Sequence, residues 1–203
     1  MPIPIKGYRI FIASPGDLDE EQKILRETIE NLNKQKYINQ EVLFIPVSHR
    51  DVAGGSGRAQ SLINSKLEEC EFLFGMFYIR FGSRPGSESE FDSGTEEEIL
   101  KALAYLKDPD KKNMINVAVF FKNVPPSQMD DPGDELKKVL DFREKIKEKI
   151  FYKEFDNIDD FKNEIIIQID KFYENTKEIR TPKRQGIRYI ATEEEANSSK
   201  EKV

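Results

Sequence analysis

The sequence predicts an α/β fold built on a parallel β-sheet, and two observations carry this prediction. Five short apolar segments alternate with five longer segments whose apolar residues recur at helical spacing. Strict alternation of strands and helices is typical of a parallel sheet covered by helices on both faces. The third apolar segment, residues 71–80, is apolar almost throughout, as expected of a strand buried on both faces.

The first strand is expected at residues 8–13 and leads into a helix start. Ser14 suits an N-cap, Pro15 suits the first helical turn, and Asp17 belongs to the same start signal. The helix that follows carries four apolar residues on one face, namely Leu18, Leu25, Ile29 and Leu32. The second strand is expected at residues 41–47, where Pro46 near the end favours an edge or bulged strand.

The middle of the chain contains the strongest strand signal and the most informative loop. Residues 51–58 are a glycine-rich loop, a short helix is expected at 61–70, and the third strand follows at 71–80. A long loop rich in glycine, serine and acidic residues spans 81–93. The next helix is expected over residues 95–106.

The rest of the chain repeats the alternation and then changes composition. A fourth strand is expected at residues 114–121, a proline-rich loop at 124–133 and a helix at 134–149. A short fifth strand at 150–155 and a last helix at 158–173 complete the pattern. From residue 176 the sequence is dominated by Lys, Glu, Ser and Asn. We therefore expect one domain over residues 1–175 and a polar C-terminal tail or linker over 176–203.

Five strands with right-handed crossovers favour a three-layer, flavodoxin-like sandwich with strand order 2-1-3-4-5. The switch point of this order lies between the first and third strands. Three segments then meet at the carboxyl edge of the sheet: the loop at residues 14–17, the loop after Arg80, and the helix start near Glu98. Ligands of open α/β sheets bind at this edge, so we expect the functional site there.

Composition narrows the classes of function. The net charge of −6 disfavours nucleic acids and anionic membranes as partners. The single cysteine, Cys70, excludes an intrachain disulfide and indicates a reducing compartment; it is expected to be a small core residue. There is no signal-peptide pattern or membrane-length apolar run, so a cytoplasmic location is expected. With one histidine and one cysteine, no metal site is expected.

The acidic start of the helix at residues 95–106 has two interpretations. Thr95 and Glu98 have the spacing of a capping box, in which each side chain bonds a free backbone amide without any chemistry. The position of this helix start, directly after the third strand, favours a functional carboxylate instead. Because helical residues are about 100° apart, Glu96, Glu97 and Glu98 cannot all face one pocket. Glu98 is the first choice and Glu97 the reserve.

Several segments of the chain resemble two known families. The apolar strand followed by residues 92–98 (DSGTEEE) resembles the Asp-x-Gly-Thr-x-x-Glu pattern of nucleoside 2-deoxyribosyltransferases. Residues 9–17 (RIFIASPGD), 51–58 (DVAGGSGR), Phe81-Gly82 and residues 93–98 resemble a TIR-like domain of unknown function. That domain is often found ahead of STAND-type NTPase modules in bacteria and archaea, and the resemblance covers about residues 7–175. The acidic insertion at residues 83–92 departs from the transferase pattern.

The TIR-like resemblance implies an activity and a role for Glu98. TIR-like enzymes cleave the nicotinamide–ribose bond of NAD with a glutamate that opens a comparable helix, and Glu98 matches it by position. Breaking an N-glycosidic bond builds positive charge on the ribose, which a carboxylate can stabilise or attack. Nicotinamide is already a cationic leaving group, so no cofactor and no general acid are required. NAD is the expected substrate.

The other candidate residues surround this glutamate in the predicted topology. Arg80 and Arg58 could bind phosphates, or each could form a surface ion pair with an acid such as Asp92. Residues 54–58 lack the Lys-Ser or Lys-Thr of a Walker motif. Further substrate-binding candidates, each with a plain structural alternative as a cap, turn or core residue, are Ser14, Asp17, Phe81, Asp92, Gly94 and Thr95. His49 is expected to be a solvated or hydrogen-bonded residue.

The expected function is therefore an NAD-consuming N-glycosidase, with a role in prokaryotic defence or stress signalling implied by the resemblance. The first alternative is a non-catalytic module that senses nucleotides or self-associates. The second is a nucleoside deoxyribosyltransferase. A nucleotide, a second copy of the chain, and a fused or associated NTPase module are the expected partners.

Overall fold

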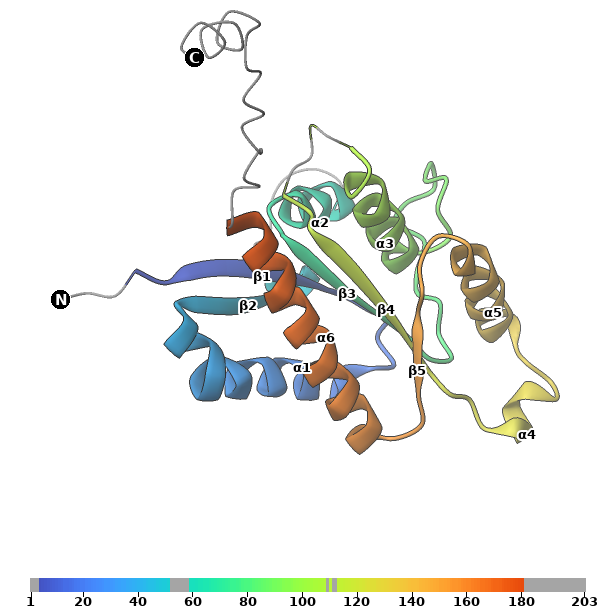
Figure 1. The fold of residues 1–203 in the computed structure, drawn as a ribbon. Helices are drawn as coiled ribbons and strands as arrows, with labels where there is room; N and C mark the ends of the chain where they lie inside the picture. Colours follow the sequence, from blue (N-terminus) through green and yellow to red (C-terminus); the bar gives the residue numbers. More distant parts are fainter. Residues whose placement is uncertain (1–3, 52–58, 109, 111–112, 181–203) are drawn as a thin grey trace, which may run out of the picture.

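The computed structural model describes residues 4–51, 59–108, 110 and 113–180, and it contains a five-stranded parallel sheet (Figure 1). The strand order β2-β1-β3-β4-β5 is the order that the sequence predicts. The strands are β1 (Lys6–Ala13), β2 (Val42–Ser48), β3 (Phe72–Phe77), β4 (Asn116–Lys122) and β5 (Lys153–Phe155). The main helices are α1 (Asp19–Leu32), α2 (Ala59–Glu68), α3 (Gly94–Tyr105), α5 (Asp134–Lys147) and α6 (Ile158–Arg180).

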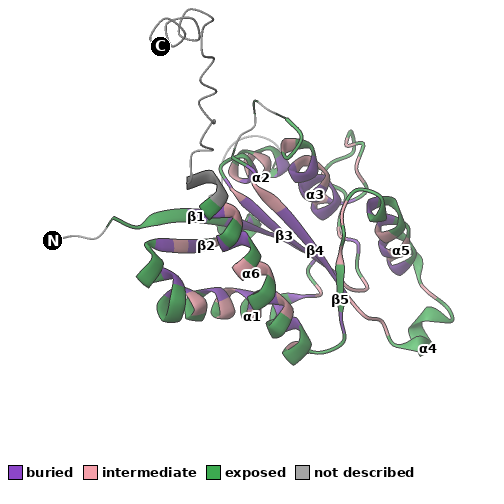
Figure 2. Ribbon diagram, viewed as in Figure 1, coloured by how far each residue is buried: buried purple, intermediate pink, exposed green. Residues whose placement is uncertain are grey.

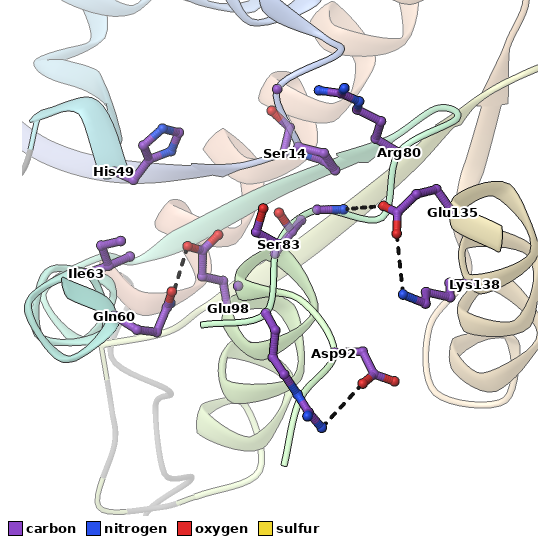
Figure 3. A pocket seen from close by; sticks show the side chains of 16 residues that line it. Ser14, His49, Gln60, Ile63, Arg80, Ser83, Asp92, Glu98, Glu135 and Lys138 are labelled. Carbon is purple, nitrogen blue, oxygen red and sulfur yellow. Dashed lines mark hydrogen bonds and ion pairs between the residues drawn. The ribbon is translucent and has the colours of Figure 1, made fainter. Parts of the chain in front are cut away.

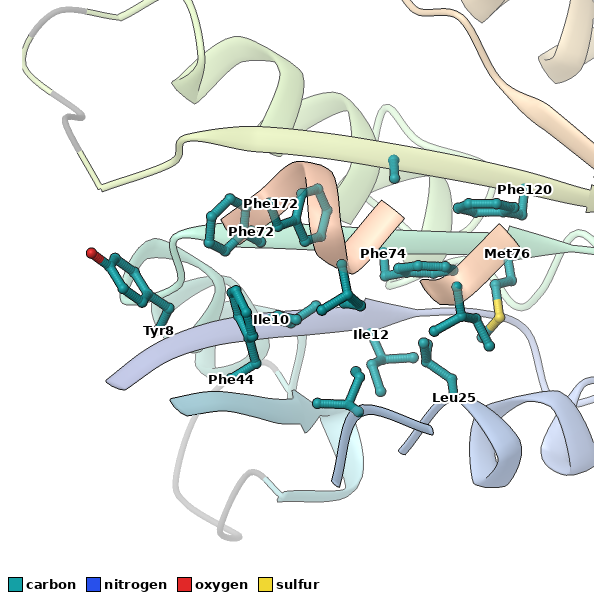
Figure 4. Close-up of a cluster of buried hydrophobic side chains, with 14 of the residues drawn as sticks. Tyr8, Ile10, Ile12, Leu25, Phe44, Phe72, Phe74, Met76, Phe120 and Phe172 are labelled. Atoms are coloured by element: carbon teal, nitrogen blue, oxygen red, sulfur yellow. The ribbon is translucent and has the colours of Figure 1, made fainter. Parts of the chain in front are cut away.

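The sheet is covered on both faces, which confirms the three-layer sandwich. Helices α1 and α6 pack on one face, where a cluster rich in phenylalanine fills the space between them and the strands (Figure 4). Helices α2, α3 and α5 pack on the other face over a second cluster. Strand β3 lies at the centre, and all six of its residues are buried (Figure 2). Its apolar sequence follows from this double burial.

Strand β1 is held on both sides and brings its end to the centre of the sheet. It pairs with β2 from Lys6↔Val42 to Ile12↔Ser48, and with β3 from Ile10↔Phe72 to Ala13↔Gly75. Strand β2 is an edge strand, as Pro46 predicts, because an edge tolerates the missing amide donor of proline.

The predicted caps at the start of the first helix are wrong. Helix α1 begins at Asp19, and its N-cap residue, Leu18, makes no side-chain cap bond. The Ser14 hydroxyl instead accepts a hydrogen bond of 2.6 Å from Gln22 Nε2. The carboxylate of Asp17 accepts from backbone amides of the segment after β3. Both side chains therefore hold the chain between β1 and α1 against other segments.

Several element boundaries differ from the sequence pattern. Strand β3 ends at Phe77, and β5 has three residues because it pairs only with Phe120, Phe121 and Lys122 of β4. The proline-rich segment predicted as loop contains a short helix, α4 (Pro126–Met129), with proline in its first turn. Two further short helical turns, η1 (Asn33–Tyr37) and η2 (Ile38–Gln40), separate α1 from β2.

Helix α6 is longer than predicted and continues to Arg180. Thr176 is fully buried, and its hydroxyl donates to the Tyr173 carbonyl at 2.7 Å. Asn116 at the start of β4 donates to the side chain of Asn175 at 2.8 Å. These contacts anchor the last turns of α6 at the amino edge of the sheet. Residues 181–203, most of the predicted tail, lie outside the described residues.

Within the described residues, no helix combines the length and apolar character needed to cross a bilayer. Cys70 is buried in the core as expected, and burial raises the pKa of its thiol to about 12.

Candidate functional site

A pocket of about 920 Å³ lies at the carboxyl edge of the sheet, where β1 and β3 end (Figure 3). It is lined by the loop after β1, the segment after β3, and the first turns of α2, α3 and α5. This is the switch point of the strand order, where ligands of open α/β sheets bind. The volume falls in the range typical of small-molecule sites.

Helix α3 is capped by residues other than those that the sequence predicts. Ser93 is the N-cap, and its hydroxyl accepts from the Glu96 amide at 3.0 Å. The carboxylate of Glu96 reaches back to the Asp92 amide at 2.9 Å and pairs with Lys145 at 2.9 Å. The capping box is therefore Ser93–Glu96, and the predicted Thr95–Glu98 box is wrong. Both pairs have the required spacing, so the pattern alone could not distinguish them.

The side chain of Glu98 therefore does not cap the helix, and it lines the pocket instead. It comes from the first turns of α3 and points toward Gln60 of α2 (Figure 3), whose Nε2 lies 3.5 Å from Glu98 Oε1. The residue is 6% exposed. Burial raises the pKa of Glu98 to about 8, the Gln60 contact opposes this rise, and the charge of Glu97 adds to it.

Glu97, the reserve candidate, faces a different environment. It is 2% exposed, and its carboxylate accepts from Asn64 Nδ2 at 2.7 Å and pairs with Lys101 at 3.0 Å. These contacts join α3 to α2, and Glu97 is not among the residues that line the pocket. The 100° step between neighbouring helical residues explains the separation.

Gly94 and Thr95 both line the pocket beside Glu98. A Cβ atom on Gly94 would lie 2.8 Å from Gln60 Oε1, so the glycine permits α2 to approach the start of α3. This close approach brings the Gln60 amide to the Glu98 carboxylate.

Arg80 lines the pocket with an exposed side chain. Within the described part of the chain its guanidinium has no ion-pair partner. The predicted alternative, a pair with Asp92, is wrong because Asp92 pairs with Arg84 at 3.6 Å. Asp92 also lines the pocket. Arg58 lies outside the described residues.

Two carboxylates bind four successive backbone amides in the segment after β3. Asp17 Oδ2 accepts from the amides of Ile79 and Arg80 at 3.1 and 2.9 Å. Glu135 Oε2 accepts from the amides of Phe81 and Gly82 at 3.0 and 3.3 Å. Burial alone would raise the pKa of Glu135, but these amides and Lys138 outweigh it, so the pKa is lowered. Glu135 lines the pocket, whereas Asp17 is not among its lining residues.

The remaining candidates divide between the pocket and the core. Ser14 lines the pocket. Phe81 is 3% exposed and packs against Phe77 and Phe142, so it is a core aromatic and not a pocket residue. His49 lines the pocket with an exposed side chain, and its pKa is lowered by partial burial and by the charge of Arg50.

Sequence reasoning missed five polar pocket residues: Ser83 and Arg84 of the loop after β3, and the three helical residues Gln60, Glu135 and Lys138. The three helical residues lie in the first turns of helices that follow other strands or loops, and each could pass for an ordinary surface residue. The signal that could have found them is topological, since helices α2, α3 and α5 all begin at the carboxyl edge. Among the residues that the structure describes, no cluster of three His, Cys, Asp or Glu side chains is arranged to hold a metal ion.

The model of a known family matches the part of the chain that forms this fold and this pocket. The model of the family described as "Domain of unknown function (DUF4062)" matches residues 9–170. The chain belongs to this family. The DUF4062 match begins within β1 and ends within α6, so it includes every residue that lines the pocket. No curated protein matches the chain.

Proposed function

We propose that this DUF4062 domain is an NAD-consuming N-glycosidase that hydrolyses the nicotinamide–ribose bond. The observation that carries the proposal is the Glu98 carboxylate, which lines a pocket at the switch point while Ser93 and Glu96 cap the helix. A buried carboxylate in a cleft with a strongly shifted pKa is typical of a functional group.

The proposed reaction needs an anion beside the ribose. The bond between the ribose C1′ and the nicotinamide nitrogen breaks, and its electron pair goes to the nicotinamide ring, which becomes neutral. The ribose develops oxocarbenium character, which an ionised Glu98 stabilises electrostatically. A water molecule then adds at C1′ and releases its proton to solvent. ADP-ribose and nicotinamide are the products.

The raised pKa of Glu98 couples its ionisation to substrate binding. Near neutral pH the carboxyl is mostly protonated in the free protein, because its pKa is about 8. The positive nicotinamide ring favours the ionised form, since an opposite charge nearby lowers the pKa of an acid. Ser14, Asp92 and Thr95 line the same pocket and are the proposed partners of ribose hydroxyl groups.

The test is the release of nicotinamide from NAD, followed by chromatography with purified protein. We expect Glu98→Gln to lower the rate by at least about 100-fold, because the transition-state charge loses its counter-ion. Glu97→Gln is the matched control, since Glu97 is equally buried in the same turn but outside the pocket. At pH 9.5, where Glu98 is ionised whether or not the charge of Glu97 raises its pKa, the rate of this control should stay within about threefold of the wild type. Equal losses in both variants would contradict the assignment of Glu98.

The pH dependence of the rate provides an independent prediction. If Glu98 must be ionised, kcat/KM for NAD should rise about tenfold per pH unit below pH 8 and level off above it. The profile is measured between pH 5.5 and 9.5. A flat profile, or one that falls over this range, would contradict a role for the ionised carboxylate.

A second candidate function is a nucleotide-binding module without catalysis. The same raised pKa favours it, because a protonated Glu98 would donate a hydrogen bond to a ligand and would not stabilise a cation. NAD binding by calorimetry without nicotinamide release would select this alternative. Exchange of bases between deoxynucleosides would instead select a deoxyribosyltransferase. On the TIR-like resemblance alone, we extend the proposal to self-association and to defence or stress signalling.

A further inference from the structure

The segment after β3 presents four successive backbone amides, from Ile79 to Gly82, and all four are bound by carboxylates of this chain. Consecutive amides that point to one side form a concave site that is suited to anions. The amide of Gly82 bonds the same carboxylate oxygen as that of Phe81, and the positive φ of Gly82, +100°, redirects the chain directly after it. Each of the two amide pairs therefore binds one anion, and the protein supplies both anions from its own side chains.

The two carboxylates differ in how accessible they are to a ligand. Asp17 lies outside the pocket, and its Oδ1 is buried without a hydrogen-bond partner among the described residues. The side chain of Glu135 is 45% exposed and lines the pocket, as does Gly82. Gly82 and Glu135 face a ligand in the pocket directly, and the Phe81 amide bonds the same Glu135 Oε2 atom, so a ligand oxygen that took the place of Oε2 would meet both amides.

One positive side chain lies beside the accessible pair, and two more line the same pocket. Lys138 lies one helical turn after Glu135 and pairs with Glu135 Oε1 at 3.3 Å. Arg80 and Arg84 line the same pocket, and Arg84 pairs with Asp92 only at 3.6 Å. Figure 3 shows Glu135 between the segment after β3 and Lys138. An anion that replaced the Glu135 carboxylate would meet two amides and one ammonium group, and Arg80 lines the same pocket.

We propose that the amides of Phe81 and Gly82, with Lys138 and Arg80, form a subsite for the pyrophosphate group of a dinucleotide, and that Glu135 leaves these amides when pyrophosphate binds. This subsite deepens the proposed function and rests on it for the identity of the ligand. Glu135 can swing into solvent because its side chain is half exposed. Its carboxylate competes with the ligand, so the residue limits affinity.

This proposal predicts that the loss of an acidic side chain increases the affinity for the ligand. Removing an acidic residue that merely orders a loop should weaken binding, whereas removing a competing anion should strengthen it. Glu135→Gln keeps the shape of the side chain and removes the charge. We expect it to bind inorganic pyrophosphate and ADP-ribose roughly tenfold more tightly than the wild type. Lys138→Gln and Arg80→Gln should each bind them about tenfold more weakly.

Helix α5 offers a matched control. Glu144 and Lys147 form a pair with the same spacing on the same helix at 3.0 Å, and neither lines the pocket. Glu144→Gln and Lys147→Gln change the net charge in the same way, and their affinities should stay within about twofold of the wild type. The measurement is isothermal titration calorimetry of the full chain with inorganic pyrophosphate and with ADP-ribose, after circular dichroism confirms that each variant is folded.

The outcomes separate this proposal from the catalytic one, because calorimetry needs no turnover. Equal or weaker pyrophosphate binding by Glu135→Gln would overturn the displacement of Glu135. Wild-type affinity in both Lys138→Gln and Arg80→Gln would overturn the subsite even if Glu135→Gln did not fold. Tighter pyrophosphate binding by Glu135→Gln, with no release of nicotinamide by any variant, would support the subsite and refute NAD hydrolysis.

Discussion

Glu97 and Glu98 show that two carboxylates at successive positions of one helix can have different environments. Glu97 and Glu98 are both buried, yet Glu97 is bound by Asn64 and Lys101, whereas the contact of Glu98 with Gln60 is 3.5 Å long. A cation and a good hydrogen bond keep a buried carboxylate ionised. Among the described residues no cation pairs with Glu98, and this explains why burial dominates its pKa.

The raised pKa of Glu98 predicts a pH-dependent cost in stability. The carboxyl titrates near its ordinary value of 4.5 in the unfolded chain and near 8 in the folded one. The favourable contribution of the protonated form is therefore complete below about pH 4.5 and is lost as the pH rises to about 8. At pH 8.5 the loss in the free energy of unfolding should be on the order of a few kcal/mol.

Glu98→Gln stays neutral at every pH and should avoid this loss. We expect its Tm to exceed that of the wild type by several degrees at pH 8.5, with a much smaller difference at pH 5.5. Thermal denaturation followed by circular dichroism measures both values. The exposed Glu144 changed to glutamine is the control, with a small effect at both pH values. A Tm difference that grew toward low pH would contradict the sign.

At the scale of elements, the start of α3 predicts a difference between two hydroxyl residues. Ser93→Ala should lower the free energy of unfolding by about 1 kcal/mol, since the alanine leaves the Glu96 amide without its acceptor. Thr95→Ala should cost less, because Thr95 does not cap the helix. Chemical denaturation of the two variants measures the difference. A larger loss of stability for Thr95→Ala would show that Thr95 caps the helix, as the sequence pattern first indicated.

This helix start also shows where prediction from sequence stops. The pattern Ser-x-x-Glu and the pattern Thr-x-x-Glu overlap within residues 93–98, and both satisfy the capping rule. The choice depends on the extended backbone of Ser93 and on Lys145 of α5, which reaches Glu96. Lys145 is far away in sequence, so no local pattern contains this information.

At the scale of the whole molecule, the fold was predictable because its signals are local and repeated. Each strand is a short apolar run and most helices carry a clear apolar stripe, so alternation predicted the strand order and the two covered faces. Element ends were less predictable, because β5 is limited by its pairing with β4. In the pocket, topology placed Ser14, Arg80 and Glu98 together, but Phe81 turns into the core one residue after Arg80. The places of Glu135 and Lys138 in the pocket depend on how α5 packs against the sheet, which no local sequence pattern contains.

The length of α6 gives a prediction for the whole domain. A chain that ends at residue 175 loses the buried Thr176 and places a terminal carboxylate beside the bond between Asn175 and Asn116. We expect its Tm to be several degrees below that of a chain that ends at residue 180, because the shorter chain lacks the buried Thr176 and its bond to the carbonyl of Tyr173, a member of the aromatic cluster. Circular dichroism of the two chains measures the difference. Equal Tm values would show that α6 contributes nothing beyond residue 175.

Strand β1 starts, and helix α6 ends, on the side of the sheet opposite the pocket, since Asn175 meets the first residue of β4. Both polypeptide ends of the described domain therefore lie at one edge of the sheet, and the entrance to the pocket lies at the opposite edge. A tether, an affinity handle or a neighbouring domain joined at either end is attached away from the entrance. Immobilising the protein through such a handle leaves the entrance facing the solvent, which suits binding measurements at a surface.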